Sequence, residues 1–294
     1  MFYVTLMGGL GNQLFQYAFG RALSLRSGLE LRLSLAFLND RAPRKGYTPR
    51  RYELDAFSIA APTTEREAGA LFRPGVLHRI EKRLRPGTRI SPRGLGFDPL
   101  LLEAVDGAIY EGYFQSERYF ADCRPILLHE LSPRRPLSPD SEDIARRIDE
   151  TESVAVHVRR GDYVSNPAVN AAFGLCGLEY YREALDAMAG RLARPVFFFF
   201  SDDMEWVKNN LSTNAECHYV DHNRREAAWE DLVLMSRCRN NIVANSTFSW
   251  WGAWLNDHPD RMVIAPDPWF ASGDVGDNII PSGWKRLPAS SKLT

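Results

Sequence analysis

The sequence predicts an α/β protein built on parallel sheets, and three observations lead to that prediction. Apolar segments alternate regularly with helical ones after residue 139. One of them, PVFFFFS at 195–201, is apolar nearly throughout, as expected of a strand covered on both faces. A proline-punctuated segment, SPRRPLSP at 132–139, separates this regular half from a less regular N-terminal half. Because strands that alternate with helices form parallel sheets, we expect two α/β domains, residues 1–135 and 136–294.

Residue periodicity gives the expected elements of each half. The N-terminal half should contain strands at 2–7, 30–35 and 108–114 and helices at 12–25 and 117–131. The C-terminal half should contain strands at 153–158, 195–201, 217–220, 241–245 and 261–265, with helices from about 178, 204, 226 and 247. We expect the last helix to pack back on the N-terminal domain. Ligands of open parallel sheets bind outside the carboxyl ends of the strands, so polar residues that follow strands are candidates for a site.

Composition excludes several classes of protein. A formal net charge of −1 argues against a nucleic-acid binder, which normally carries a basic surface. The arginines and lysine of segment 73–93 form a local exception, either as a solvated face or as a patch for an anionic glycolipid or membrane surface. Four widely spaced cysteines fit reduced thiols in a cytosol. With no membrane-spanning window, we expect a cytoplasmic protein, at most peripheral at the inner face of the membrane.

The segment VAVHVRRGDYV, residues 154–164, ends an expected strand in two adjacent arginines. Alternate side chains of a strand share a face, so His157 and Arg159 should lie on one face and the valines on the other. Guanidinium groups match phosphate geometry, so the arginines predict a diphosphate site, with Arg160 joining Arg159 or pairing with Asp162. The alternative is an Arg–Asp bridge at the base of a loop, without a ligand.

A glycine loop joins the first expected strand to the first expected helix in MGGLGNQLFQYA, residues 7–18. Such a loop lets backbone approach a ligand, and the helix N-terminus favours anions. Leu14 stands where a G-x-G-x-x-G pattern needs its third glycine, which weakens a dinucleotide interpretation. Asn12 is a candidate ligand contact, with the N-cap of the helix as its alternative role. Gln13 and Gln16 are unusual in an apolar helix start and indicate a polar cleft.

Polar residues also follow two further expected strands. After the strand at 195–201, Asp202 is a candidate acceptor for a ribose or a base, although Ser201, Asp202 or Asp203 could instead cap the next helix. At 244–247 the sequence ANST offers hydroxyls and backbone N–H groups to a phosphate at a strand-to-helix turn. The sequence has no D-x-D, H-E-x-x-H or Cys/His cluster, so we expect arginine and no metal to supply the positive charge.

Five segments, in this order, closely resemble the bacterial alpha-1,2-fucosyltransferases of glycosyltransferase family 11: MGGLGNQLFQYAFG, HVRRGDYV, GLEYYREAL, FFFSDD and NSTFSWWGAWL. The resemblance implies a GT-B fold, in which two Rossmann-like domains face each other across a cleft, the N-terminal one on the acceptor side and the C-terminal one binding GDP-fucose. It implies inverting, metal-independent transfer of L-fucose from GDP-β-L-fucose to the 2-hydroxyl of a terminal galactose, in an oligosaccharide or glycolipid. No cofactor is implied, because GDP-fucose is a co-substrate.

The resemblance also implies roles by position. Arg159 and Arg160 would neutralise the departing diphosphate, and Asp202 would serve the guanosine end of the donor. The G-N-Q of protein O-fucosyltransferases resembles residues 11–13, which implies that Asn12 orients the fucose or the acceptor. The residues expected to contact GDP-fucose are Gly11, Asn12, Gln13, Arg159, Arg160, Asp202, Asn245, Ser246, Thr247 and Phe248.

The general base does not transfer from related enzymes. The alpha-1,6-fucosyltransferases carry a glutamate after the arginine motif, where this chain reads VSNPAVNAAF, without an acid. His157 and Asp162 are the local candidates, beside a base-free route assisted by the leaving group. With Arg159 and Asn12 they complete the expected catalytic set. Alternatives are a fucosyltransferase that makes another linkage and a non-catalytic protein that binds a nucleotide sugar or a glycan.

Overall fold

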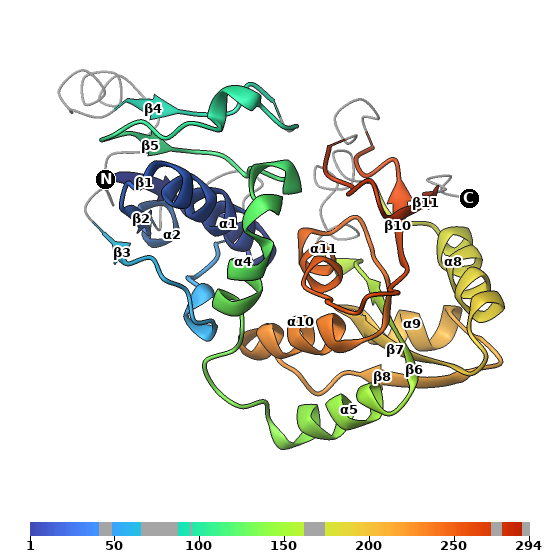
Figure 1. Ribbon diagram of the computed structural model, residues 1–294. Coiled ribbons are helices and arrows are strands. Elements are labelled where there is room, and N and C mark those ends of the chain that lie inside the picture. Colours follow the sequence, from blue (N-terminus) through green and yellow to red (C-terminus); the bar gives the residue numbers. More distant parts are fainter. Residues whose placement is uncertain (41–48, 66–87, 95, 162–173, 272–277, 290–294) are drawn as a thin grey trace. The chain divides into compact units, whose positions relative to one another are not determined.

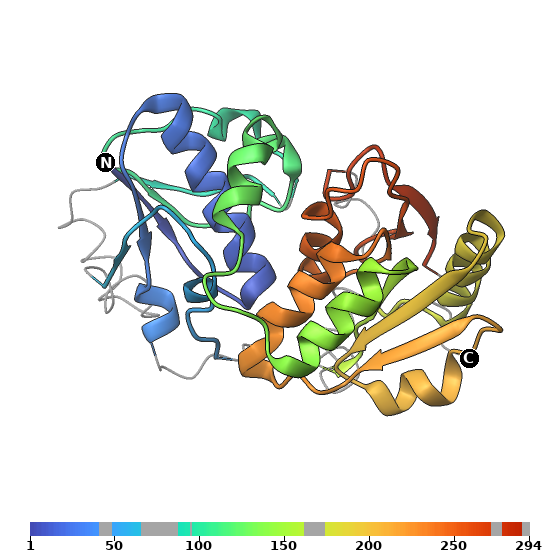
Figure 2. The same ribbon diagram turned by 60° about the horizontal axis from the view of Figure 1, so that its bottom comes forward.

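The computed structural model describes residues 1–40, 49–65, 88–94, 96–161, 174–271 and 278–289. The chain divides into two compact units, Met1–Arg134 and Arg135–Thr294, whereas the sequence places the division after residue 135. Each unit has a parallel sheet of its own, as Figures 1 and 2 show.

The N-terminal unit is built on a five-stranded sheet in the order β3-β2-β1-β5-β4, and every paired strand is parallel to its neighbour. Its strands are β1 (Phe2–Thr5), β2 (Leu31–Ser34), β3 (Thr63–Thr64), β4 (Arg89–Ile90) and β5 (Ile109–Tyr110). Its α-helices are α1 (Leu10–Ser27), α2 (Ala36–Asn39) and α4 (Arg124–Glu130). Short 3-10 helices lie at η1 (Leu54–Ala56), η2 (Pro99–Leu101), η3 (Glu117–Tyr119) and η4 (Ala121–Cys123).

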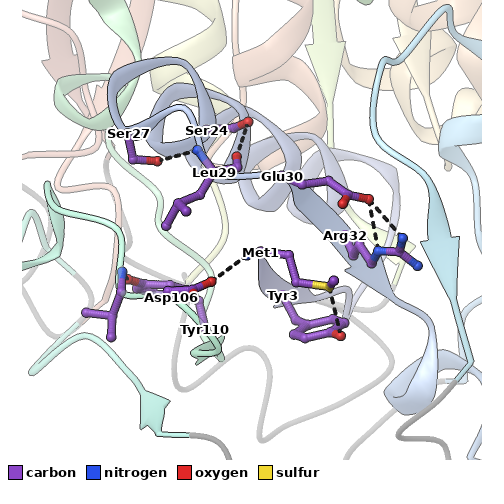
Figure 3. Close-up of polar contacts among 10 residues, drawn as sticks. Met1, Tyr3, Ser24, Ser27, Leu29, Glu30, Arg32, Asp106 and Tyr110 are labelled. Carbon is purple, nitrogen blue, oxygen red and sulfur yellow. Dashed lines mark hydrogen bonds and ion pairs between the residues drawn. The ribbon is translucent and has the colours of Figure 1, made fainter.

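The helix α1 crosses from β1 to β2 and ends at a left-handed glycine. Gly28 has a φ of 71°, and its N–H donates to the carbonyl oxygen of Ser24 at 2.9 Å. Figure 3 shows how side chains complete this turn: the Ser24 hydroxyl donates to the carbonyl of Leu29 at 2.7 Å, and Leu29 N–H donates to Ser27 Oγ at 3.2 Å. The turn leads directly into β2.

The helix expected at 117–131 is wrong in one respect, because the segment is broken. It consists of η3 and η4 followed by α4. Phe120, between the two 3-10 helices, has a φ of −145°, which no α-helix accommodates. Pro125 then occupies the first turn of α4, where its missing N–H costs nothing.

The C-terminal unit is built on a six-stranded parallel sheet in the order β11-β10-β9-β6-β7-β8. Its strands are β6 (Glu152–Val158), β7 (Pro195–Ser201), β8 (Glu216–Val220), β9 (Asn240–Ile242), β10 (Val263–Asp267) and β11 (Lys285–Pro288). Its helices are α5 (Pro139–Asp149), α8 (Leu178–Arg191), α9 (Met204–Asn210), η5 (Arg225–Ala227), α10 (Ala228–Arg237) and α11 (Thr247–Trp254). The described residues after α11 form strands and no helix, and the last described element, β11, joins this sheet. The expected packing of a last helix on the N-terminal domain stays a prediction.

The two faces of β6 are covered by different elements, as the sequence predicts. Val154, Val156 and Val158 are buried in a cluster with side chains of α8 and α9. His157 points to the other face, where its ring lies 5.5 Å from that of Phe248 in α11. The strand β7 is buried from Val196 to Phe200, as expected for a strand covered on both sides.

Three further expectations concern the basic segment, the cysteines and membrane-spanning helices. Most of the basic segment 73–93 lies outside the described residues; of its described part, Arg89 pairs with Glu111. All four cysteines are free thiols. None of the helices in the described part of the chain combines the length and apolarity that a bilayer crossing requires.

Candidate functional site

The sheet order brings three of the predicted polar segments together. Strands β9, β6 and β7 are neighbours and parallel, so the residues that follow them meet at one edge of the sheet. The segments are 159–161 after β6, 202–203 after β7 and 244–247 after β9. The carboxyl edge of the C-terminal sheet is therefore the candidate site of this unit.

Asp202 holds the loop that carries the arginines. Its Oδ1 accepts from Arg160 N–H at 2.9 Å, and its Oδ2 accepts from Gly161 N–H at 3.1 Å. The Arg159 guanidinium pairs with the same Oδ2 at 2.9 Å. A Cβ on Gly161 would lie 2.6 Å from this oxygen, so a larger residue would displace the Asp202 carboxylate. Both oxygens of Asp202 are thus engaged by its own chain, which differs from the predicted contact with the guanosine end of the donor.

Arg160 is fixed by two other groups. Its Nε donates to Asp203 Oδ2 at 3.1 Å, and its guanidinium lies 4.0 Å from the centre of the Trp206 ring. Asp203 also caps α9, because its Oδ1 accepts from Trp206 N–H at 3.1 Å. Of the three residues considered as caps, Asp203 is therefore the one used. The predicted partner of Arg160, Asp162, lies outside the described residues.

His157 lies beneath the arginines and is 4% exposed. Burial lowers the pKa of its imidazole to about 4, against a partial rise from the nearby Asp202 carboxylate, and Arg159 lowers it further. The ring is therefore neutral at physiological pH. Among the described residues no hydrogen-bond partner meets its Nδ1. So low a pKa makes His157 a weak base, which reduces its value as the predicted acceptor of the substrate proton.

In the segment after β9, the buried Asn245 forms hydrogen bonds that hold the protein's own loops together. The Asn245 amide donates to the carbonyl oxygens of Gly174 at 3.2 Å and Trp269 at 3.4 Å, and its Oδ1 accepts from the Cys176 thiol. Asn245 thus joins three separate segments at the sheet edge. A contact with the donor, as predicted, would compete with these bonds.

The start of α11 is better suited than Asn245 to bind a phosphate. Ser246 is its N-cap, and its Oγ accepts from the N–H of Phe248 at 3.3 Å. Thr247 and Phe248, the first helical residues, are half-buried. The first backbone N–H groups of a helix lack intrahelical acceptors, so this turn can donate to an anion.

The glycine loop of the N-terminal unit is held by two buried glutamines. Gln13 is fully buried; its amide donates to the carbonyls of Gly8 and Arg51, and its Oε1 accepts from Glu53 N–H. Gln16 is also fully buried and joins Met7 N–H to the carbonyl of Gly112. The expectation of a polar cleft at these residues is therefore wrong, and Gln13 supports the loop from below.

Asn12 is half-buried in the first turn of α1, next to the buried Gly11. The N-cap of α1 is Gly9, so the alternative role for Asn12 as the cap is wrong. Its Oδ1 accepts from Gln115 Nε2 at 3.0 Å. Gln115 follows β5, the neighbour of β1 in the sheet, and sequence reasoning missed it. Its position after an expected strand was the available signal.

A second missed cluster follows β8, the edge strand of the C-terminal sheet. Asn223 Nδ2 donates to Asp231 Oδ1 at 2.7 Å, and the Ser141 hydroxyl lies 2.9 Å from His222 Nε2. Burial raises the pKa of Asp231 to about 7, although the bond from Asn223 opposes the rise. The neighbouring Glu230 accepts from both the N–H and the hydroxyl of Ser138. The cluster ties α5 and α10 to the end of β8.

Comparison with known proteins places the chain. The model of the family described as "Glycosyl transferase family 11" matches residues 106–285. The chain belongs to glycosyl transferase family 11. This family 11 chain is therefore a glycosyltransferase, and the predicted family is confirmed.

Two bacterial relatives match the family 11 chain over nearly its whole length. An alpha-1,2-colitosyltransferase of Escherichia coli is 32% identical over 290 residues, which cover 96% of this chain and 97% of the relative. The O-antigen biosynthesis glycosyltransferase WbnK of Escherichia coli is 30% identical over 317 residues, covering 97% and 100%.

A solved structure supports the fold of the family 11 chain. The structure of an Arabidopsis thaliana FUT1 variant in complex with GDP matches 99% of this chain and 77% of its own, with a TM-score of 0.51 and 11% identity. Together with the two parallel-sheet units, this likeness confirms the GT-B class that the sequence predicts.

Proposed function

We propose that this chain transfers L-fucose from GDP-β-L-fucose to the 2-hydroxyl of a terminal galactose in an oligosaccharide or glycolipid. The observation that carries the proposal is the pair of arginines at the carboxyl edge of the C-terminal sheet, next to the start of α11. Both features suit a diphosphate leaving group. Membership of family 11 supplies the reaction class.

The two arginines are suited to different tasks in this proposal. If Arg159 turns from Asp202 to a phosphate, Asp202 keeps its bonds from the N–H groups of Arg160 and Gly161. Because Asp202 stays hydrogen-bonded, the free-energy cost of breaking its ion pair with Arg159 is reduced. Arg160 has a dedicated carboxylate and a stacking ring, which hold its guanidinium in place. Arg159 is the arginine that moves onto the leaving group, and Arg160 is a fixed part of the site.

In the proposed reaction, the oxygen of the acceptor hydroxyl attacks the anomeric carbon as the bond to the diphosphate oxygen breaks. GDP departs with the bonding electron pair, and the configuration at the anomeric carbon inverts. Negative charge grows on the diphosphate in the transition state, where Arg159 and the hydroxyls and N–H groups of Ser246 and Thr247 stabilise it. The acceptor proton passes to a side-chain base or to the departing diphosphate. His157, with a pKa of about 4, is a weak base, and the other candidate, Asp162, lies outside the described residues.

Colitosyl transfer is the second candidate, and the full-length likeness to an alpha-1,2-colitosyltransferase favours it. Colitose is L-fucose without its 3-hydroxyl, so the two donors share the GDP, the leaving group and the inverting chemistry. They differ only where the protein meets the sugar ring. The arginine site serves either donor equally.

The test uses the purified chain with GDP-fucose or GDP-colitose and a panel of galactosides that includes lactose. We expect GDP release that persists in EDTA, a preference for GDP-fucose, and a 2'-linked product by NMR. Faster turnover of GDP-colitose would transfer the proposal to the second candidate. A product of another linkage would correct the acceptor position. Binding of GDP without turnover of either donor on any galactoside would contradict catalysis.

A further inference from the structure

Asn12 and Gln115 form a hydrogen-bonded pair of amides at the carboxyl edge of the N-terminal sheet. The strands β1 and β5, which precede them, are parallel neighbours. Gln115 Nε2 donates to Asn12 Oδ1 at 3.0 Å. We propose that this pair is a subsite for one hydroxyl of a sugar substrate, with Gln115 as a specificity-determining residue. The proposal rests on the glycosyl transfer proposed above.

In the described part of the chain, the pairing leaves one amide oxygen and one amide nitrogen without a hydrogen-bond partner. Within the described residues, neither the Gln115 carbonyl oxygen nor Asn12 Nδ2 has a hydrogen-bond partner. A hydroxyl group both donates and accepts, so one hydroxyl can donate to Gln115 Oε1 and accept from Asn12 Nδ2. The reverse pairing of the two amides would leave the same combination of one donor and one acceptor. The subsite therefore fits a hydroxyl better than a carboxylate or an ammonium group.

The backbone on both sides fixes this pair. Gly8 has a φ of 78°, and a Cβ at this position would lie 2.4 Å from Asn12 Nδ2. On the other side, Phe114 has a φ of 49°, which is unfavourable for a residue other than glycine. The Phe114 ring stacks on that of Phe19 with the centroids 3.8 Å apart. Packing of the ring thus holds the strained backbone that sets Gln115 against Asn12.

The surroundings of the pair indicate unused polar capacity. Gln115 is 7% exposed, so a hydroxyl bound to it would be largely shielded from water. Thr5 Oγ1, at the end of β1, and Ser116 Oγ, next to Gln115, are fully buried and lack hydrogen-bond partners in the described part of the chain. Native structures leave few buried hydroxyls in this state. By contrast, the side-chain amides of Gln13 and Gln16 are hydrogen-bonded to backbone groups.

The hydroxyl can come from the donor sugar or from the acceptor, and deoxygenated substrates separate the two sources. Wild type and Gln115→Ala would be compared on GDP-fucose and its 2-, 3- and 4-deoxy analogues as donors, the 3-deoxy sugar being colitose. The acceptors would be methyl β-galactoside and its 3-, 4- and 6-deoxy analogues. We expect Gln115→Ala to lower kcat/KM about 10- to 100-fold on the parent substrates. On the one analogue that lacks the recognised hydroxyl, the loss should shrink to within about threefold, because the contact is already absent.

An equal loss on every analogue would overturn the proposal, since a structural role for Gln115 cannot depend on one substrate hydroxyl. Gln16→Ala is the matched control: it removes a buried amide of the same unit, and its losses should be equal across the analogues. If Gln115→Ala does not fold, Gln115→Met keeps the length of the side chain. It removes both the donor to Asn12 and the acceptor for the hydroxyl, and the same selective loss is expected.

The wild-type assay separates failure of this inference from failure of the proposed function. Turnover with equal losses contradicts the subsite alone. Without turnover of any donor, the proposed function fails, and saturation-transfer NMR of lactose and GDP-fucose with wild type and Gln115→Ala tests the subsite directly. Saturation of the same ring protons in both proteins would then overturn it, and loss at one ring position would support it.

Discussion

Two adjacent arginines at the end of β6 have different partners. Arg159 shares Asp202 with two backbone N–H groups, whereas Arg160 has Asp203 and the face of Trp206. Alternate residues of a strand point to opposite faces, so neighbours in sequence meet different surroundings. In the proposed function Arg159 exchanges Asp202 for the diphosphate, whereas Arg160 keeps its partners, although both are guanidinium groups.

Substitution of the arginines should separate these roles. We expect Arg159→Ala to keep the fold and to lose more than about tenfold in kcat, which is at least about 1.4 kcal/mol of barrier. Arg160→Ala should lose less in kcat but lower thermal stability, because Asp203 and Trp206 lose their partner. Steady-state kinetics and thermal unfolding measure both effects, with the exposed Arg147→Ala as control. If Arg159→Ala retains more than a tenth of wild-type kcat, Arg159 does not stabilise the leaving group as proposed.

The buried imidazole of His157 makes a prediction about pH. Its pKa falls from 6.5 to about 4 on folding, so between these values the unfolded chain binds more protons than the native one. Stability should therefore decrease as pH falls from about 7, with a full cost near 3 kcal/mol below pH 4. Urea unfolding at pH 7 and pH 5 measures the difference. His157→Leu should reduce that difference, and His129→Gln, which changes an exposed ring, should leave it as in wild type. An unchanged pH difference in His157→Leu would contradict the effect.

At the scale of elements, long and strongly patterned segments could be predicted and short ones could not. Helix α8 begins where expected, and β7 has the expected bounds. The strands β3, β4 and β11 have two to four residues, too few for an alternating pattern to show. Their places come from pairing with neighbours, which is a tertiary effect.

The location of the candidate site could be predicted from the sequence, but the contacts between its side chains could not. The rule that ligands lie after strands pointed to segments 159–161, 202–203 and 244–247, and the sheet brings them together. It did not show that β6 and β7 are neighbours, and only that pairing places Asp202 against the arginine loop. The predicted contact of Asp202 with the guanosine end stays a prediction. Gln115 was missed for the same reason, since only the sheet order places it against Asn12.

Close packing of α1 on its sheet gives a prediction at this scale. A Cβ on Gly20 would lie 2.8 Å from Leu31 Cδ1 and 2.9 Å from Val4 Cγ2, both in buried side chains. Gly20→Ala should therefore destabilise the N-terminal unit by about 1–3 kcal/mol. Gly190→Ala is the matched control in α8, with nothing within 4 Å of its Cβ, and it should stabilise by about 0.5–1 kcal/mol. Chemical denaturation of both variants measures the signs, and a stabilising Gly20→Ala would refute the close contact.

At the scale of the whole molecule, each unit has the parts of an independent domain. The C-terminal unit has its own six-stranded sheet and a buried cluster formed by residues of that unit. It also contains every group proposed for the diphosphate, whereas Asn12 and Gln115 belong to the other unit. In these two proposals, the nucleotide is therefore bound by one unit and a sugar hydroxyl is recognised by the other.

This division predicts the behaviour of the fragment 135–294. It should unfold cooperatively and bind GDP with a Kd within about tenfold of that of the full chain, because the phosphate contacts are complete within it. It should transfer no sugar, since the whole N-terminal unit, which includes the amide pair, is missing. Isothermal titration with GDP measures the affinity, and Arg159→Ala in the fragment should weaken it as much as in the full chain. A folded fragment that binds GDP more than a hundredfold more weakly would show that the N-terminal unit supplies nucleotide contacts, and would move part of the donor site onto residues 1–134.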